Sequence, residues 1–264
     1  MRSYISYIIY ISIICLSACY DRKEVCLDTA ASNFDVTGDD ACSGCCTFPS
    51  LVLEFTHYNG DSIYKATDTL INDHLQEYVI EDVRYYLSDF TLFQSDSSHT
   101  IREKIATENN KIIIANDMKI MRSVDGELNI GTVRLYGKFD SLSFHLGLTE
   151  EITNNSFFGL PSNHVLLQNN KLKNSIGETA YFTLKYKRLS PVMDTVSQNI
   201  YITDRPNFTA LKSGTVITST KGTKISYPFK ADYKVLLQDI DLTLTEDSIS
   251  KKLYLNLKKM IQPK

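Results

Sequence analysis

Apolar and polar residues alternate along several runs of the chain from Leu51 onward. A period of two places every second side chain on the same face of a strand. Five runs show the pattern, and their apolar rows are Leu51, Leu53 and Phe55; Phe144, Leu146 and Leu148; Phe182, Leu184 and Tyr186; Ile240, Leu242 and Leu244; and Leu253, Leu255 and Leu257. Each run therefore predicts a strand with one buried face.

Turn signals separate these runs. Asn59-Gly60, Asp125-Gly126 and Lys221-Gly222 have the composition and spacing of loops in hairpins or sandwiches, and not of helical crossovers. The sequence contains no internal repeat and no low-complexity linker. We therefore expect an all-β fold, a single antiparallel β-sandwich, over residues 51–264.

One segment of this region has a different period. Within residues 66–78, Leu70, Ile71 and Leu75 recur at helical spacing. We expect one short helix here.

Composition agrees with a β domain and narrows its partners. The chain has 264 residues, of which 43% are hydrophobic, which is enough for a substantial core. It has 16 Tyr and 12 Phe but no Trp, a bias that suits strands. With 28 Lys and Arg against 31 Asp and Glu, the net charge of -3 gives no positive field, so nucleic-acid binding is disfavoured.

Residues 1–18 have the pattern of a targeting signal. An apolar run from Ile8 to Leu16 follows Arg2 and is too short to span a membrane comfortably. Leu16-Ser17-Ala18-Cys19 then resembles the bacterial lipobox, in which the cysteine is lipidated and becomes the mature N-terminus. The resemblance implies a lipoprotein signal peptide over 1–18 and membrane anchoring through lipid on Cys19. The alternative is an ordinary cleaved signal or a hydrophobic anchor.

The residue after Cys19 bears on the location of the protein. The residue at this position is Tyr20 and not Asp. By resemblance to the sorting rules of enterobacterial lipoproteins, a residue other than Asp here favours location in the outer membrane. We expect a bacterial cell-envelope protein, an outer-membrane lipoprotein that faces the periplasm or the cell surface.

Four further cysteines lie within residues 19–50, namely Cys26, Cys42, Cys45 and Cys46. In an oxidising compartment such a cluster indicates disulfides that staple a small segment. Joining the adjacent Cys45 and Cys46 would be strained, which leaves two pairings. These are Cys26 to Cys45 with Cys42 to Cys46, or Cys26 to Cys46 with Cys42 to Cys45. A four-thiolate zinc site would also fit the count, but export argues against free thiolates. Cys42 and Cys45 have the spacing of a redox motif, but no βαβ pattern surrounds them and Cys46 offers a competing partner.

The same segment is acidic, and its oxygen-bearing side chains are Asp28, Asn33, Asp35, Asp39 and Asp40. Their spacing lacks the regular pattern of an EF-hand calcium loop, so we interpret them as solvated acids of turns. The run from Cys26 to Cys42 resembles a cysteine-bounded segment of surface proteins of Bacteroidota, which indicates origin more than chemistry.

Three strings in the β region resemble one family. They are FTHYNG at 55–60, DVRYYLSDFTL at 82–92 and GKFDSLSFHLGL at 137–148, with a weaker echo in AYFTLK at 180–185. They are similar to the MbnP-like family of secreted or lipid-anchored β proteins, named after a copper-binding periplasmic protein of methane-oxidising bacteria. The resemblance covers roughly residues 51–190 and adds a final strand pair at 231–258. It implies copper, or another transition metal, as the ligand class.

The copper chemistry of the family transfers only in part. Its characterised members bind copper through histidines and through a kynurenine made from Trp by a partner enzyme. This chain has no Trp, so that ligand cannot form. Histidines remain, and His57 is the candidate metal ligand, because it ends the apolar row of the first strand and matches a family histidine. The alternative is a histidine hydrogen-bonded at the rim of the core.

The other candidate ligands are scattered along the chain. His74, His99, His145 and His164 have no partner at the usual ligand spacing. His145 alternates with Phe144 and Leu146, so it should point away from their row. Met118 and Met121 would fall on opposite faces of a strand.

Enzyme motifs are lacking. The sequence has no nucleophile elbow, no phosphate loop and no zinc-protease motif, so we expect a protein that is not an enzyme. Acidic residues such as Glu54, Asp82, Asp89 and Asp140 could pair in space, but the sequence selects no pair of them as a glycosidase dyad.

Two adjacent tyrosines could line a glycan groove. On a strand, Tyr85 and Tyr86 point to opposite faces, so we expect one to pack inward and the other to support loops. Taken together, the sequence predicts a lipid-anchored cell-envelope binding protein with copper or another transition metal as inherited ligand. The alternative is a surface module that binds glycan or protein and has no metal site.

Overall fold

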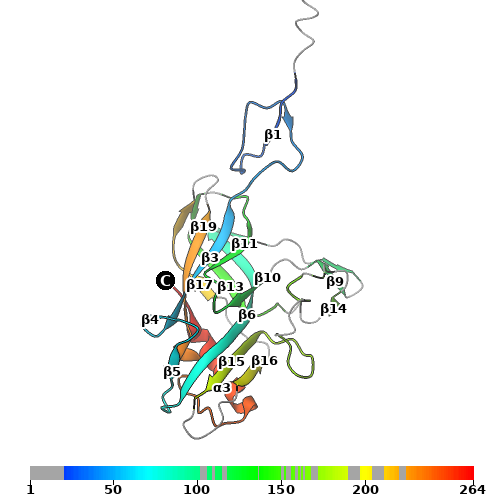
Figure 1. The fold of residues 1–264 in the computed structure, drawn as a ribbon. Helices are drawn as coiled ribbons and strands as arrows, with labels where there is room; N and C mark the ends of the chain where they lie inside the picture. Colours follow the sequence, from blue (N-terminus) through cyan, green and yellow to red (C-terminus); the bar gives the residue numbers. More distant parts are fainter. Residues whose placement is uncertain are drawn as a thin grey trace, which may run out of the picture.

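Two β-sheets pack face to face in the computed structural model (Figure 1). The structure describes residues 21–101, 106–108, 111–114, 118–135, 137–149, 152, 156–157, 160, 162, 164–167, 172–189, 197–203, 211–219 and 224–264. The predicted signal peptide over residues 1–18, the predicted lipidation site Cys19 and the predicted Lys221-Gly222 turn lie outside this part of the chain.

The larger sheet has eight strands built around the long β6. β15 pairs the first half of β6 and β13 pairs the second half. The order is β16-β15-β6-β13-β17, and β5, β7 and β10 also pair with β6. The bounds are β5 Thr69–Ile71, β6 Glu77–Gln94, β7 Ser97–Thr100, β10 Met118–Arg122, β13 Ser141–Leu146, β15 Phe182–Arg188, β16 Ser197–Ile202 and β17 Leu211–Ser213.

The smaller sheet has five strands in the order β11-β3-β19-β20, with β4 paired to β3. Most pairs in both sheets are antiparallel, but β3 and β19 run parallel, which the hairpin pattern did not predict. The bounds are β3 Ser50–Asn59, β4 Ser62–Ile63, β11 Glu127–Thr132, β19 Ile225–Asp232 and β20 Ile261–Pro263. Gly60 has a φ of 63° in the β3–β4 hairpin, a conformation that favours glycine at the predicted Asn-Gly turn.

Shorter elements complete the molecule. They are β1 Glu24–Val25 with β2 Asp40–Ala41, β12 Gly137–Phe139 with β18 Ile217–Ser219, and β8 Ala106–Glu108 with β9 Lys111–Ile114 and β14 Ser156–Phe157. A 3-10 helix, η2 (Lys234–Leu236), follows β19, and the α-helix α3 (Glu246–Met260) precedes β20. None of the described helices is both long enough and apolar enough to span a membrane.

The predicted alternation decides which side chains form the core between the sheets. The apolar rows that begin at Leu51 and Phe182 are buried in one cluster, as are Phe144 and Leu146. Tyr85 joins this cluster, whereas Tyr86 faces the opposite side of β6 and packs with loop residues such as Leu160 and Leu166. The sandwich and the opposite directions of the two tyrosines are therefore confirmed.

The expected helix over 66–78 is wrong. Leu70 is buried in the short strand β5, but Ile71 is 50% exposed and Leu75 is 84% exposed with a φ of 58°. The side chain of the buried Asn72 accepts hydrogen bonds from the backbone N–H of His74 and Gln76, which turns the chain between β5 and β6. This local turn competes with a helix and prevails.

The expected strands at 240–244 and 253–257 are also wrong. The first run is a loop, and the second lies inside α3. Ile249, Leu253 and Leu257 recur every four residues and are buried, whereas Leu255 is 63% exposed. The period of the buried positions is therefore helical, and the strand pair that the family resemblance implied at 231–258 does not form.

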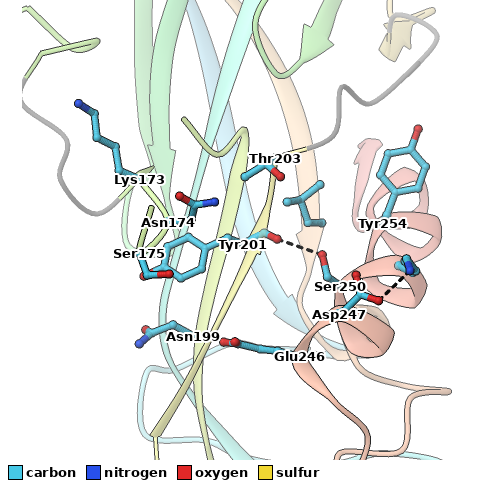
Figure 2. A pocket seen from close by; sticks show the side chains of 12 residues that line it. Lys173, Asn174, Ser175, Asn199, Tyr201, Thr203, Glu246, Asp247, Ser250 and Tyr254 are labelled. Carbon is cyan, nitrogen blue, oxygen red and sulfur yellow. Dashed lines mark hydrogen bonds and ion pairs between the residues drawn. The ribbon is translucent and has the colours of Figure 1, made fainter. Parts of the chain in front are cut away.

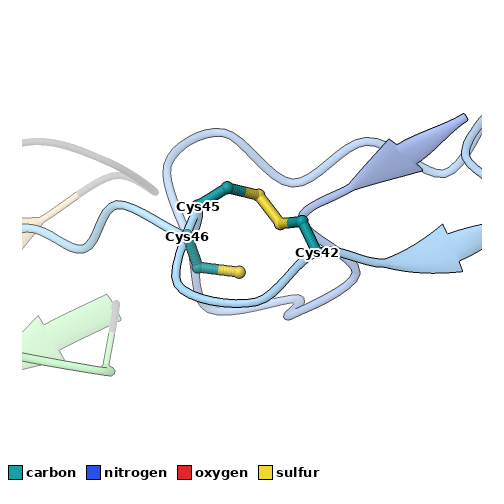
Figure 3. A group of neighbouring side chains, drawn as sticks. All are labelled: Cys42, Cys45 and Cys46. Atoms are coloured by element: carbon teal, nitrogen blue, oxygen red, sulfur yellow. A yellow bond between two sulfur atoms is a disulfide. The ribbon is translucent and has the colours of Figure 1, made fainter.

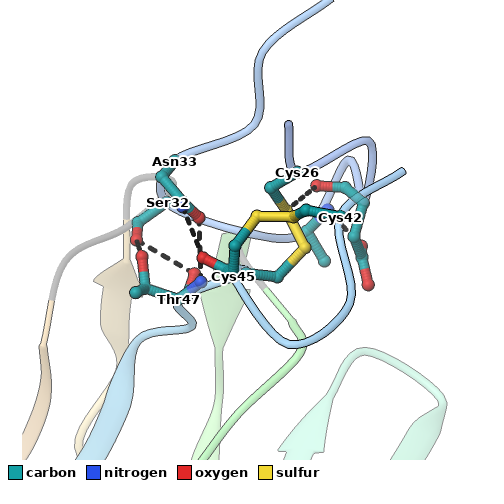
Figure 4. The surroundings of a disulfide bond; sticks show 9 residues. Cys26, Ser32, Asn33, Cys42, Cys45 and Thr47 are labelled. Carbon is teal, nitrogen blue, oxygen red and sulfur yellow. Dashed lines mark hydrogen bonds between the residues drawn. A yellow bond between two sulfur atoms is a disulfide. The ribbon is translucent and has the colours of Figure 1, made fainter. Parts of the chain in front are cut away.

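A small stapled segment precedes the sandwich and lies at one end of the molecule, with β1 (Figure 1). Disulfides join Cys26 to Cys46 and Cys42 to Cys45, with Cα–Cα distances of 5.0 and 5.8 Å. This is one of the two predicted pairings. Asn33 and Ser32 tie the segment together by hydrogen bonds to Cys45 and Thr47 (Figure 4). β3 begins at Ser50, directly after it.

Candidate functional site

Three cysteines bring their sulfur atoms together in the stapled segment. The Sγ atoms of Cys42, Cys45 and Cys46 lie within 4.8 Å of one another (Figure 3). In the described part of the chain this is the one group of three or more His, Cys, Asp or Glu at ligand spacing. Because Cys42 is bonded to Cys45 and Cys46 to Cys26, no thiolate is available to a metal.

The acids of this segment serve its turns. Asp28 accepts a hydrogen bond from the backbone N–H of Ala30 at 2.9 Å, and Asp39 accepts one from the N–H of Lys23 at 2.9 Å. Asp35 accepts from the Lys23 ammonium at 2.7 Å and from Thr37, and these bonds hold the pKa of its carboxyl well below its usual range. Asp28 and Asp35 thus bond residues of their own turns, as predicted, whereas the contacts of Asp35 and Asp39 with Lys23 also join distant parts of the segment.

His57 lies half-buried at the end of β3, with both ring nitrogens engaged by the protein. Its Nδ1 is 2.8 Å from the Tyr233 hydroxyl, and its Nε2 is 2.7 Å from the backbone oxygen of Asp125. The carbonyl can only accept, so Nε2 carries the proton and Nδ1 accepts from Tyr233. The rings of His57 and Tyr233 also stack at 5.5 Å.

Burial lowers the pKa of His57, although the hydrogen bond to the Asp125 carbonyl opposes that shift. Burial likewise raises the pKa of Tyr233 well above its usual value. Both groups are therefore neutral near pH 7. Their hydrogen bonds connect β3, the end of β19 and the turn before β11. This arrangement matches the predicted alternative of a histidine bonded at the rim of the core.

The remaining sequence candidates are dispersed. His145 points away from Phe144 and pairs across strands with Asp89, at 3.0 Å between Nδ1 and Oδ2. His164 accepts a backbone hydrogen bond from Leu166. Met118 and Met121 are buried in different clusters on opposite faces of the sheet, as predicted.

The four acids considered for a dyad have separate roles. Glu54 pairs with Lys224 at 3.2 Å, Asp82 with Arg84 at 2.7 Å, and Asp89 with His145. Asp140 accepts a hydrogen bond from the backbone of Ser95. Each acid thus serves a different local contact.

A polar hollow of about 670 Å³ opens where β16, α3 and the chain around residues 173–175 meet (Figure 2). Tyr201 and Asn199 enter it from β16, and Glu246 and Ser250 enter it from α3. Asn174 borders it from the third side (Figure 2). We call the region around these residues the distal groove.

A second hollow of about 370 Å³ extends the distal groove over the outer face of the larger sheet. It shares Asn199 and Tyr201 with the first and continues across Thr183, Lys185 and Arg84. Strand register explains the arrangement, because Tyr201, Thr183 and Arg84 are direct partners on β16, β15 and β6. Residues that share a register row on adjacent strands project from the same face.

Ion pairs neutralise most charges in the distal groove. Lys251 lies 2.7 Å from Asp247, Lys185 lies 2.8 Å from Glu81, and Arg84 lies 2.7 Å from Asp82. The hydrogen bond from Lys185 lowers the pKa of Glu81, and the same bond raises the pKa of Lys185. The groove thus offers paired charges and neutral hydrogen-bonding groups.

Sequence reasoning missed the distal groove. The alternation in β16 predicts only that Asn199 and Tyr201 share one face. Glu246 and Ser250 were assigned to no site, and the residues after them were expected to form a strand. Without α3, nothing indicated that these side chains meet.

Comparisons with known proteins give a match among solved structures. No protein-family model matches the chain, and no curated protein matches it. Among solved structures, MbnP from Methylosinus trichosporium is similar with a TM-score of 0.47 and 11% identity, covering 74% of this chain and 79% of that chain. This likeness concerns architecture and does not transfer what MbnP binds.

Proposed function

We propose that the protein is a lipid-anchored, non-enzymatic binding protein of the cell envelope that holds its ligand in the distal groove. The observation that carries the proposal is the groove itself, which joins two hollows of about 670 and 370 Å³. These volumes lie in the range of small-molecule sites. Its lining includes the rings of Tyr201 and Tyr254, amides and hydroxyls, which converge from three separate parts of the chain.

The placement of the groove supports an anchored role. The stapled segment follows the lipobox cysteine and lies at one end of the molecule, whereas α3 and the paired ends of β15 and β16 lie toward the other (Figure 1). A lipid on Cys19 would therefore hold the sandwich by one end and present the distal groove away from the membrane.

Charge in the groove supports binding over hydrolysis. A glycosidase needs one carboxyl with a raised pKa to donate a proton to the leaving group. The pKa of Glu81 is lowered instead, because Lys185 bonds its carboxylate, and Asp82 is paired with Arg84. These carboxylates are suited to hydrogen bonding and not to general acid catalysis.

Copper, the ligand implied by the family resemblance, does not fit the surroundings of His57. A copper ion needs a free imidazole lone pair, but Nδ1 of His57 accepts from Tyr233 and Nε2 donates to a carbonyl. No group of three or more His, Cys, Asp or Glu in the described ranges includes His57. We therefore place the ligand in the distal groove.

Anchoring is tested by phase partition. We expect the wild-type protein, expressed in its own host, to enter the detergent phase of Triton X-114, and the Cys19→Ser variant, once residues 1–18 have been removed from it, to stay in the aqueous phase. A processed variant that still partitions into detergent would contradict the lipid anchor. Cys15→Ser, which changes a cysteine within the signal, is the matched control and should behave as wild type.

The groove is tested by cosedimentation with isolated envelopes of the producing bacterium. We expect the full-length protein, purified in detergent, to bind washed envelopes, and Tyr201→Ala and Asn199→Ala to weaken the binding. Tyr58→Ala is the matched control, since Tyr58 lies on β3 beneath the Lys230 ammonium and outside the groove. Equal binding by wild type and both groove variants would refute the proposed function.

A further inference from the structure

We propose that the distal groove binds an uncharged glycan chain. This inference rests on the proposed function and names the ligand class for the same site. It follows from the hydrogen-bonding state of the groove, its aromatic ring, its charge balance and the way the edge of β16 is covered.

Several polar groups of the groove have no hydrogen-bond partner within the described ranges. Among the described residues, the side-chain amide of Asn199 and the hydroxyls of Tyr201 and Thr203 make no hydrogen bond, although many other polar side chains of the sandwich do. An amide offers two donors and an acceptor in one plane, and a hydroxyl offers both functions. Such groups match the vicinal hydroxyls of a sugar, which also donate and accept.

An aromatic ring lies beside these groups. Tyr201 is half-buried on the outer face of β16, between Asn199 and the chain at Asn174 and Ser175 (Figure 2). An aromatic ring provides a flat apolar surface with a polar tip. A pyranose ring has the complementary form, with C–H groups on its face and hydroxyls at its edge.

Charge balance argues for an uncharged ligand. The two hollows contain four cationic residues, namely Lys173, Lys251, Arg84 and Lys185, and four acidic ones, namely Glu246, Asp247, Glu81 and Asp82. Their sum is zero, and three pairs are within 2.8 Å. A site for a polyanion needs a surplus of cations, which this groove lacks.

The covered edge of β16 argues against an extended peptide. Peptides that add to a sheet need an open edge with free backbone groups. Here α3 lies against β16, and the Ser250 hydroxyl donates to the backbone oxygen of Tyr201 at 3.0 Å. Strand addition at this position is therefore blocked, so the ligand is recognised by side chains.

The span of the groove favours a chain over a single sugar. It crosses β6, β15 and β16, which at the usual strand spacing covers about 10 Å, and then continues to α3. Asn199 and Tyr201 lie where the two hollows join, so they would contact the middle of the bound chain.

The test uses the full-length protein in detergent and envelopes treated in two ways. Periodate cleaves the vicinal diols of sugars, and proteinase K, then inactivated, removes protein. We expect periodate to abolish binding and proteinase K to leave it unchanged. We also expect the neutral oligosaccharides released from the same envelopes by mild acid to compete, and the acidic ones retained by an anion exchanger not to compete.

Variants connect the ligand to the groove. We expect Tyr201→Ala to weaken binding of the neutral oligosaccharides at least about fivefold, Tyr201→Phe to weaken it less, and Tyr58→Ala to leave it unchanged. Binding that survives periodate but not proteinase K would overturn the glycan assignment in favour of a protein ligand. Competition by the acidic fraction alone would overturn it in favour of a charged ligand.

These failures differ from failure of the proposed function. If the ligand proved to be a protein or a charged glycan, binding to untreated envelopes would still depend on Tyr201. Only the proposed ligand class would then be wrong. If binding to untreated envelopes does not depend on Tyr201 or Asn199, the groove itself is not the site.

Discussion

At the scale of single residues, the pair of His57 and Tyr233 shows how position changes the role of a side chain. The same imidazole that sequence indicates as a metal ligand is held between a buried hydroxyl at 2.8 Å and a carbonyl at 2.7 Å. A neutral histidine satisfies both partners, whereas a protonated one cannot accept from Tyr233. The fold therefore stabilises the neutral form.

This preference predicts a pH dependence of stability. The folded pKa of His57 is lowered from about 6.5 by burial, so the unfolded chain binds the proton more tightly. The contribution of His57 is present above pH 6.5 and is lost as the pH falls toward the folded pKa. We expect the free energy of unfolding of wild type, minus that of His57→Gln, to decrease between pH 7.5 and 5 in urea titrations. A difference that stays constant would contradict this role.

The same geometry predicts the outcome of a copper titration. Because neither nitrogen of His57 is free, we expect His57→Ala to bind copper with the same stoichiometry and affinity as wild type, aerobically and anaerobically. Isothermal titration calorimetry measures both quantities. Loss of a binding site in the variant alone would place copper at His57 after all.

At the scale of elements, α3 is where two sequence patterns compete. Leu253, Leu255 and Leu257 alternate as a strand would, yet Ile249, Leu253 and Leu257 follow a helical period. The helix also has Thr245 as N-cap, acids in its first turn and Lys258 and Lys259 in its last. The N-cap satisfies a free backbone N–H at the start of the helix, and the charges at the two ends interact favourably with the helix dipole. Both features favour a helix over a strand.

A buried amide on α3 connects the helix by hydrogen bonds to the chain at residues 236–239. Asn256 is 4% exposed, and its Nδ2 donates to the Leu236 oxygen at 3.1 Å and to Asp239 at 2.7 Å. We expect Asn256→Ala to lower the free energy of unfolding by about 1–3 kcal/mol, because a buried carbonyl loses its partner. The exposed neighbour Leu255→Ala should change it by about 0.5 kcal/mol or less. Urea titration compares the two, and equal losses would contradict this role.

At the scale of the whole molecule, the stapled segment and the sandwich depend on different forces. The sandwich has a continuous apolar core that contains residues of both sheets and α3. The stapled segment contributes few buried apolar side chains, among them Cys26 and Ala31, and its shape depends on disulfides and turn hydrogen bonds. We therefore expect the two parts to respond differently to loss of a disulfide.

The disulfide that closes the larger loop should stabilise the stapled segment more than the other disulfide. Cys26–Cys46 closes a separation of 20 residues and Cys42–Cys45 one of 3, so the first constrains the unfolded segment more. We expect the double variant Cys26→Ala/Cys46→Ala to lose amide protection in residues 21–49 and to keep it in β6. Cys42→Ala/Cys45→Ala should have a smaller effect. Hydrogen exchange measures both, and loss of protection in β6 would contradict the division.

The sequence by itself determined the features that depend on neighbours along the chain. Alternation placed the buried rows around Leu51, Phe144 and Phe182, and the cysteine cluster indicated a stapled segment. These predictions succeeded because the pleat of a strand imposes an alternating pattern and because cysteines that pair within a short segment lie close together in the sequence. The choice between the two disulfide pairings already required coordinates, because both satisfied the spacing.

Only the tertiary structure decided what depends on distant contacts. Whether 253–257 forms a strand or a helix depended on which of its leucines the core covers, and the parallel pairing of β3 with β19 joins residues about 170 positions apart. The distal groove likewise joins Tyr201 to Ser250 through packing of α3 on β16. Burial and long-range pairing are properties of the folded chain, so the local pattern could not contain them.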